Sequence, residues 1–380
     1  MLQSVLEGDV VDRKDPANQA NTAMNMTESP ILRIRGLNKT YGKFTALHDI
    51  DIDVPGGEFL TIVGPSGSGK TTLIKLLVGM EDQTRGEIWL RDQRLDILPA
   101  NKRPTCMVFQ SLALFPHRSV GQNIEFPLKV RGTEPSARES KARELLDLFR
   151  LPQNYYTKRI DECSGGERQR IALARALAFD PEILFFDEPL SALDFRLRKT
   201  LEKELKALHE RTGKTFVYIT HSLEEAMIMS DRIAILREGR FEQIGPAAEI
   251  YSKPRSRFVA SFMGDVNLFD VSPVTGKVEG LEVASTNALV NSTKGGGSTL
   301  MVRPEKLRFL AWDDKADFQT SGQVAGSYLL GSRTQYEIRS TSGANLVLET
   351  GNETRLIHTG DTVKVGFSGE DAHLIADASV

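Results

Sequence analysis

The sequence predicts an α/β domain with a mostly parallel sheet and a helical subdomain, followed by a small all-β domain. Apolar stretches alternate with helical patterns from residue 31 to about residue 262, which is typical of a parallel sheet covered by helices. A glycine-rich loop joins one of these stretches to a helix. After about Gly264 the helical patterns stop, and short strand-like runs between turn residues predict a barrel-like domain.

The predicted strands of the first domain show two kinds of pattern. Two runs alternate apolar and polar residues and predict half-buried strands, at residues 32–35 and 50–54. Continuous apolar runs predict fully buried strands at residues 59–63, 183–186, 215–219 and 233–236. Since helical patterns separate these runs, we expect most of the strands to lie parallel in one sheet.

Helical periodicity predicts the segments that cover this sheet. The predicted helices lie at residues 71–80, 137–151, 164–178 and 196–210, and the region 118–163 is mostly helical. In the helix at 196–210, leucines repeat at helical spacing over too short a length for a coiled coil. Its apolar face is therefore predicted to belong to the core.

Composition describes a globular protein with more than one domain. The chain has 380 residues, of which 40% are hydrophobic and 26% are charged, as in a two-domain protein. Its formal net charge of −3 gives no electrostatic basis for nucleic acid as a main partner. The two cysteines, Cys106 and Cys163, build no disulfide framework and favour a reducing cytosol. No apolar run is long enough for a membrane helix, so we expect any membrane function to need another subunit.

The first residues form a polar segment without the apolar region of a secretory signal. Their low hydrophobicity predicts a disordered tail over residues 1–30. Met24 and Met26 stand just before the ordered pattern, which leaves a later translation start open as a hypothesis. N-terminal sequencing that finds Met1 or Leu2 would exclude it.

The glycine-rich loop has the complete pattern of a phosphate-binding loop and assigns the first domain to the P-loop NTPase class. Its residues are Gly64, Pro65, Ser66, Gly67, Ser68, Gly69, Lys70, Thr71 and Thr72. The glycines let backbone N–H groups converge on phosphate oxygens, and the following helix adds its positive N-terminal end. We expect Lys70 to reach the β- and γ-phosphates of ATP and the Thr71 hydroxyl to ligate Mg²⁺.

An acidic pair, Asp187 and Glu188, follows the buried strand at 183–186. An isolated pair of this kind is commonly a solvated strand end, but the four apolar residues before it and Pro189 after it favour a functional role. Asp187 is expected to hold Mg²⁺ through water. Glu188 is expected to polarise a water for attack on the γ-phosphate.

Five further motifs, taken in order, resemble the ATP-binding subunits of ATP-binding-cassette (ABC) transporters. Ser164-Gly165-Gly166-Glu167 resembles the start of the signature helix, and Ser191-Ala192-Leu193-Asp194 resembles the D-loop. Gln110 resembles the Q-loop glutamine, His221 the switch histidine, and Tyr41 the aromatic residue that stacks on adenine. The ordered set is far more specific than any one motif.

The resemblance covers about residues 31–262 and implies a homodimer. In the family, two subunits pack head to tail, and the helix start at Ser164, Gly165 and Gly166 of one copy caps the γ-phosphate held by Lys70 of the other. It further implies a metal contact for Gln110, a catalytic role for His221, and nucleotide contacts for Tyr41, Glu167 and Asp194. We therefore expect Ser164 and Lys70 to lie far apart within one chain.

Two residues of the signature depart from the family pattern. Cys163 stands where the family usually has leucine, and a small apolar side chain is expected to pack in that place. Glu167 stands where glutamine is common, although importer-type members often carry an acid there. We expect function to survive both departures.

The last part of the chain, residues 263–380, resembles the TOBE-type barrel of importer subunits. Met301-Val302-Arg303-Pro304-Glu305 and Tyr328-Leu329-Leu330-Gly331 carry this resemblance. In the family this barrel aids dimerisation and sometimes senses cargo or regulators. An OB-like nucleic-acid-binding module is the alternative, which the lack of a basic groove with interleaved aromatics disfavours.

The resemblance implies an ATPase subunit at the cytoplasmic face of the inner membrane. Its implied partners are two permease subunits, which Phe115 and Pro116 would contact, and an extracytoplasmic solute-binding protein. The stretch from Gln110 to Gly132 most resembles polyamine importers, whose cargo is spermidine or putrescine. Sugar, iron, sulfate and phosphonate stay open as cargoes. A soluble ABC-type ATPase acting on nucleic acid or ribosomes is the other class, disfavoured because the chain has one cassette and no coiled-coil insertion.

Overall fold

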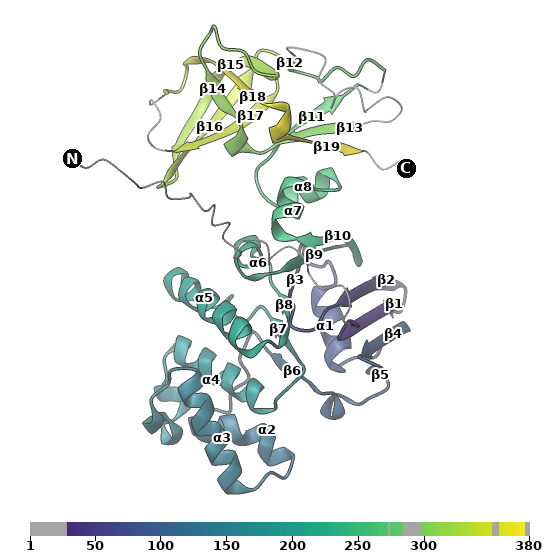
Figure 1. Ribbon diagram of the computed structural model, residues 1–380, viewed down its shortest axis with the longest axis vertical. Coiled ribbons are helices and arrows are strands. Elements are labelled where there is room, and N and C mark those ends of the chain that lie inside the picture. The colour runs from purple at the N-terminus through teal and green to yellow at the C-terminus, as the bar shows by residue number, and fades with distance from the viewer. Residues whose placement is uncertain (1–28, 273, 284–297, 352–356, 377–380) are drawn as a thin grey trace, which may run out of the picture.

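The computed structural model describes residues 29–272, 274–283, 298–351 and 357–376. An α/β part occupies one end of the molecule and an all-β part the other, joined through two short helices (Figure 1). The predicted tail lies outside the described residues except for Ser29 and Pro30.

A six-stranded sheet forms the centre of the α/β part. Its strands are β3 (Phe59–Val63), β6 (Thr105–Val108), β7 (Ile183–Asp187), β8 (Thr215–Ile219), β9 (Arg232–Arg237) and β10 (Arg240–Pro246). They lie in the order β10-β9-β3-β8-β7-β6, and all neighbouring pairs are parallel except β10 with β9. The prediction of a mostly parallel sheet is confirmed.

The helices of this part are α1 (Lys70–Val78), α2 (Val120–Val130), α3 (Pro135–Leu148), α4 (Gly165–Ala178), α5 (Phe195–Thr212) and α6 (Leu223–Met229). Alternate residues of each central strand enter two different cores. In β7, Leu184 and Phe186 pack with α2 to α5, whereas Ile183 and Phe185 pack with α1. This burial on both faces explains why the strands read as continuous apolar runs.

A second, antiparallel sheet packs on the α1 side of the central sheet. Its strands are β1 (Leu32–Tyr41), β2 (Phe44–Val54), β4 (Arg85–Leu90) and β5 (Gln93–Arg94), in the order β2-β1-β4-β5. Ile34 and Ile52 share a core with Leu73 of α1. The two alternating runs are strands, as predicted, but their separation into a sheet of their own was not predicted.

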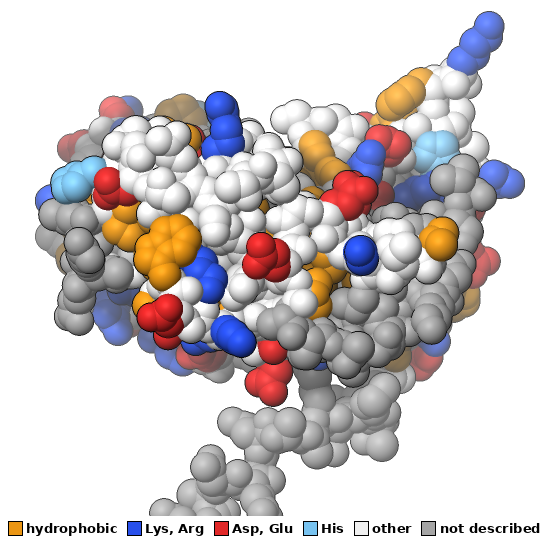
Figure 2. Space-filling model, turned by 90° about the horizontal axis from the view of Figure 1, so that it is seen from above, with side chains coloured by type: hydrophobic (Ala, Val, Ile, Leu, Met, Phe, Trp, Pro, Cys, Tyr) orange, Lys and Arg blue, Asp and Glu red, His pale blue; other side chains and the backbone are white. Residues whose placement is uncertain are grey.

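The C-terminal part contains two antiparallel sheets around one core, which confirms the predicted all-β domain. Its strands are β11 (Asn267–Val271), β12 (Glu282–Val283), β13 (Ser298–Val302), β14 (Arg308–Leu310), β15 (Phe318–Leu329), β16 (Arg333–Ser340), β17 (Asn345–Gly351), β18 (Thr362–Phe367) and β19 (Ala372–Ala376). Figure 2 shows its outer face, where the described acidic and basic side chains are interspersed and form no continuous basic groove.

Two short helices, α7 (Ala247–Ser252) and α8 (Arg257–Phe262), connect the two parts. The division of the chain between residues 262 and 263 stays a prediction, and β11 begins at Asn267. Within the described ranges, no helix is long and apolar enough to cross a membrane.

Arg303 fastens the all-β part to these connecting helices. Its buried guanidinium donates hydrogen bonds to the carbonyl oxygens of Tyr251 (2.8 Å), Ala260 (2.9 Å) and Asp265 (3.2 Å). Burial lowers the pKa of Arg303, but an arginine stays charged near neutral pH. The hydrogen bonds therefore have a charged donor.

Replacing Arg303 with alanine is expected to lower the free energy of unfolding by about 2–4 kcal/mol, because several carbonyl groups, including that of the buried Ala260, lose a charged donor. Chemical denaturation of the full chain measures the change. The control is Arg308→Ala, since Arg308 is exposed on the same domain and surface changes cost roughly 0.5 kcal/mol or less. Equal stability of the two variants would contradict the fastening role.

Candidate functional site

Four groups of predicted site residues lie at one edge of the central sheet. The phosphate loop follows β3, Asp187 ends β7, and two further loops place His221 after β8 and Gln110 after β6. These four strands are neighbours and parallel, in the order β3-β8-β7-β6. Their carboxyl ends therefore share one edge, which is where open α/β sheets bind ligands.

The phosphate loop presents the free end of α1. Gly69, in the left-handed conformation with φ 106°, precedes the helix, and no side chain caps it. Ser68 Oγ is buried and has no hydrogen-bond partner among the described residues. A Cβ at Gly64 would lie 2.0 Å from the carbonyl oxygen of Leu236, so only glycine fits there. Uncapped helical amides beside an unpaired hydroxyl suit an anion.

Lys70 is folded onto the loop that it follows. Its ammonium donates hydrogen bonds to the carbonyl oxygens of Gly64 (2.7 Å) and Pro65 (3.0 Å). Since an ammonium has three N–H donors, one donor remains beyond these two bonds. Burial lowers the pKa of Lys70, while the charges of Glu188 and Asp187 act in the opposite direction. A phosphate would add a negative partner to this buried cation.

The predicted catalytic pair is in contact. Glu188 Oε2 lies 3.1 Å from His221 Nδ1. Glu188 also has a positive φ of 46°, a conformation that costs a residue with a Cβ about 1–3 kcal/mol and is concentrated at functional sites. Its backbone N–H donates to the Ile219 carbonyl oxygen at 2.9 Å, which fixes its position beside β8.

Ser191 connects Gln110 to the same pair. The amide Nε2 of Gln110 donates to Ser191 Oγ at 3.0 Å, and that hydroxyl donates to the Glu188 carbonyl oxygen at 2.9 Å. Sequence reasoning placed Ser191 only as the first residue of the D-loop motif and did not predict this bridge. The serine of the D-loop motif was the sequence feature from which this bridge could have been predicted.

The predicted metal ligands suit Mg²⁺ better than they suit a metal ion that is coordinated only by protein side chains. Burial and the neighbouring charge of Glu188 raise the pKa of Asp187, so a cation beside it would be favourable. Within the described part of the chain, no group of three or more His, Cys, Asp or Glu could hold a metal. Thr71, Gln110 and Asp187 supply a single carboxylate, as is usual where Mg²⁺ also takes water and substrate phosphate oxygens.

The signature helix start is held by a capping box. Ser164 Oγ accepts from the Glu167 N–H, and the Glu167 carboxylate accepts from the Ser164 N–H at 2.7 Å. Hydrogen bonds to Ser164 and Tyr155 lower the pKa of Glu167. This α4 end and the phosphate loop share no hydrogen bond or ion pair among the described residues. α4 packs with α2 and α3, on the other side of the central sheet from α1 (Figure 1).

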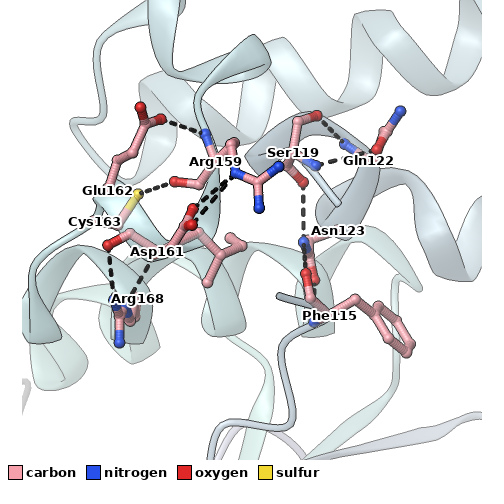
Figure 3. A network of polar contacts seen from close by, with 10 residues as sticks. Phe115, Ser119, Gln122, Asn123, Arg159, Asp161, Glu162, Cys163 and Arg168 are labelled. Carbon is pink, nitrogen blue, oxygen red and sulfur yellow. Dashed lines mark hydrogen bonds and ion pairs between the residues drawn. The ribbon is translucent and has the colours of Figure 1, made fainter. Parts of the chain in front are cut away.

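Figure 3 shows how the loop after Gln110 is anchored in the same helical subdomain. The side chain of Asn123, fully buried on α2, accepts from the Phe115 N–H (2.8 Å) and donates to the carbonyl oxygens of Phe115 (3.1 Å) and Ser119 (2.9 Å). Ser119 in turn forms a backbone bridge to Arg159, whose carbonyl oxygen accepts from Cys163 Sγ at 3.3 Å. Cys163 is therefore packed and hydrogen-bonded, and burial raises the pKa of its thiol.

Two predicted nucleotide contacts have other partners in the structure. Asp194 caps α5 by accepting from the Leu197 N–H at 3.0 Å. Tyr41 is 44% exposed, and its hydroxyl donates to Glu81. That hydrogen bond raises the pKa of Tyr41. Both nucleotide contacts stay predictions.

Comparison with protein families gives two matches. The ABC transporter family matches residues 47–191, a range that begins in β2 and ends at Ser191. The TOBE domain matches residues 300–375, which contain most of the strands of the all-β part.

The chain is similar to several bacterial spermidine/putrescine import ATP-binding proteins named PotA. It is 40% identical to the protein of Roseobacter denitrificans over 328 residues, covering 84% of this chain and 89% of the relative. It is 41% identical to the protein of Ruegeria pomeroyi over 355 residues, covering 90% and 96%. Among solved structures, the dimeric ATP-binding cassette MJ0796 bound to ADP and Pi is 30% identical, with a TM-score of 0.50, over 57% of this chain and 98% of that chain.

Proposed function

The chain belongs to the ATP-binding subunits of ABC transporters, and we propose from this membership that it drives polyamine import through partner membrane subunits. As a member of this family it binds ATP and is an ATPase coupled to transport. One observation carries the polyamine assignment: identities of 40% and 41% to two spermidine/putrescine import proteins over most of each chain. The TOBE domain at residues 300–375 supports an importer-type subunit.

ATP binding uses the loop after β3. The amides from Gly67 to Thr72 and the positive end of α1 hold the phosphate oxygens, and Lys70 donates its remaining N–H to them. Tyr41 stacks on adenine. The unpaired buried hydroxyl of Ser68 gains a partner when the phosphates are bound.

Hydrolysis uses the acidic side of the site. Thr71, Gln110 and Asp187 hold Mg²⁺, which when bound offsets negative charge on the phosphates. Glu188 accepts a proton from the attacking water, and His221, 3.1 Å away, orients that carboxylate. In-line displacement of ADP by this water gives ADP and inorganic phosphate.

A second copy completes the site. Ser164, Gly165, Gly166 and Glu167 of one subunit, with its Asp194, face the γ-phosphate held by Lys70 of the other. The dimeric state of the solved relative supports this arrangement. The pair is expected at the cytoplasmic face of the inner membrane, with two permease subunits and an extracytoplasmic solute-binding protein.

Transport measurements test the proposal. Deletion of the gene is expected to reduce uptake of radiolabelled spermidine or putrescine to background, and the parent gene, but not one carrying Glu188→Gln, is expected to restore it. Unchanged polyamine uptake with loss of sugar, iron, sulfate or phosphonate uptake would overturn the cargo. Recovery of the purified protein with ribosomes or DNA, and without a permease, would overturn the transport class.

A further inference from the structure

The backbone just after Gln110 contains two consecutive residues in the left-handed region. The φ angles of Leu112 and Ala113 are 60° and 47°. Neither residue is a glycine, so the Cβ of each disfavours this conformation. Strained positions of this kind persist where the surrounding structure holds them, which raises the question of what holds this pair.

The guanidinium of Arg175, in the last turn of α4, contacts both strained residues. Its Nη1 donates to the Ala113 carbonyl oxygen at 2.6 Å and its Nη2 to the Leu112 carbonyl oxygen at 2.7 Å. The planar guanidinium presents two parallel N–H groups, a geometry that lysine cannot reproduce. The Arg175 guanidinium carbon also lies 5.7 Å from the centre of the Phe115 ring.

The strained segment lies between two fixed points. On one side, Gln110 donates to Ser191 Oγ, which donates to the Glu188 carbonyl oxygen. On the other side, the buried side chain of Asn123 holds the Phe115 backbone. Between these points the Leu112 N–H donates to the Phe109 carbonyl oxygen at 2.9 Å, and Arg175 is the side chain that bonds the carbonyl oxygens of Leu112 and Ala113.

We propose that Arg175 is a positioning residue that holds Leu112 and Ala113 in their strained conformation and thereby keeps Gln110 on the metal side of the site. Because Arg175 and Ser164 stand at opposite ends of α4, the signature helix and Gln110 are mechanically linked. A shift of α4 would move the carbonyl partners of Arg175 and change the reach of Gln110. The inference rests on the proposed roles of Gln110 and Glu188.

The test uses the full chain carrying Arg175→Ala or Arg175→Lys. Without nucleotide, hydrogen exchange in the peptide covering residues 109–118 is expected to become faster in both variants. The Mg²⁺ concentration for half-maximal ATPase activity is expected to rise about 10- to 100-fold, as for other groups that orient metal ligands. ATP binding without Mg²⁺ is expected to stay unchanged, because Arg175 does not contact the phosphate loop.

A second substitution separates positioning from general stability. Ala113→Gly in the Arg175→Ala background is expected to restore slow exchange and part of the Mg²⁺ response, since glycine adopts positive φ without a Cβ penalty. The matched control is Arg170→Ala, because Arg170 is on the same helix and bonds the Glu204 carboxylate at 2.8 Å and 2.9 Å. This control is expected to keep the parent Mg²⁺ dependence and exchange.

The outcomes are distinct. Parent-like exchange and Mg²⁺ dependence in Arg175→Ala would overturn the inference. So would losses that Ala113→Gly does not reverse and that Arg170→Ala reproduces, because they would indicate a structural role only. If Glu188→Gln hydrolyses ATP like the parent, the proposed role of Glu188 as the base fails instead, whatever the Arg175 variants do.

Discussion

Replacing Glu188 with glutamine is expected to stop hydrolysis while ATP stays bound. The substitution keeps the shape and the oxygen that faces His221 Nδ1 at 3.1 Å but removes the group that accepts the proton. General bases contribute typically about 10²- to 10⁴-fold to a rate, so kcat is expected to fall by that factor. The phosphate loop is untouched, and the Kd for ATP is expected to remain that of the parent.

If ATP stays bound to the Glu188→Gln variant, its oligomeric state is also expected to change. If the signature end of α4 in one copy caps the phosphates bound by the other, the glutamine variant is expected to elute as a dimer on gel filtration with ATP and Mg²⁺. The parent is expected to return to monomers as it hydrolyses the nucleotide.

The matched control is Glu182→Gln. Glu182 precedes the same strand at its other end and pairs with Arg91 at 2.7 Å, away from the phosphate loop. The Glu182→Gln variant is expected to hydrolyse ATP at the parent rate. Hydrolysis by Glu188→Gln at the parent rate would show that Glu188 is not the base.

Much of the α/β architecture could be predicted because the signals are local. The buried strands β3, β7 and β8 are apolar runs whose residues alternate between two cores, and α4 begins directly after Ser164, where the helix was predicted to start. The sheet that contains β1 and β4 was not predicted as a separate layer. Alternation along β1 indicates that one face is buried, but it does not identify the partner strand.

The contacts between motifs could not be predicted. Gln110 and Ser191 are 81 residues apart in sequence, and Arg175 and Ala113 are 62 apart, so no local spacing pattern joins them. The left-handed conformation of Leu112 and Ala113 is also imposed from outside, by Arg175, and neither residue type indicates it. Motif order locates the participants, whereas their hydrogen bonds depend on the tertiary packing.

Replacing Lys70 with alanine is expected to abolish most nucleotide affinity. The ammonium is the cation of the loop, and it is already positioned by Gly64 and Pro65. Hydrogen bonds to charged groups contribute about 1.5–3 kcal/mol each, and about 1.4 kcal/mol is a tenfold change. Loss of the phosphate contacts is therefore expected to weaken ATP binding by about 100-fold, which calorimetry on the full chain measures.

Thermal unfolding distinguishes two roles of Lys70, namely binding phosphate and only stabilising the loop. A ligand that binds the folded state raises Tm, and the rise grows with the logarithm of its affinity, so Lys70→Ala is expected to lose most of the ATP-dependent rise. Lys75→Ala, which removes a half-exposed lysine of the same helix paired with Glu81 at 3.4 Å, is expected to keep it. Since Lys70 also bonds Gly64 and Pro65, Tm without nucleotide is the second measurement. A lowered Tm without nucleotide, together with a preserved ATP-dependent rise, would mean that Lys70 stabilises the loop and does not bind phosphate.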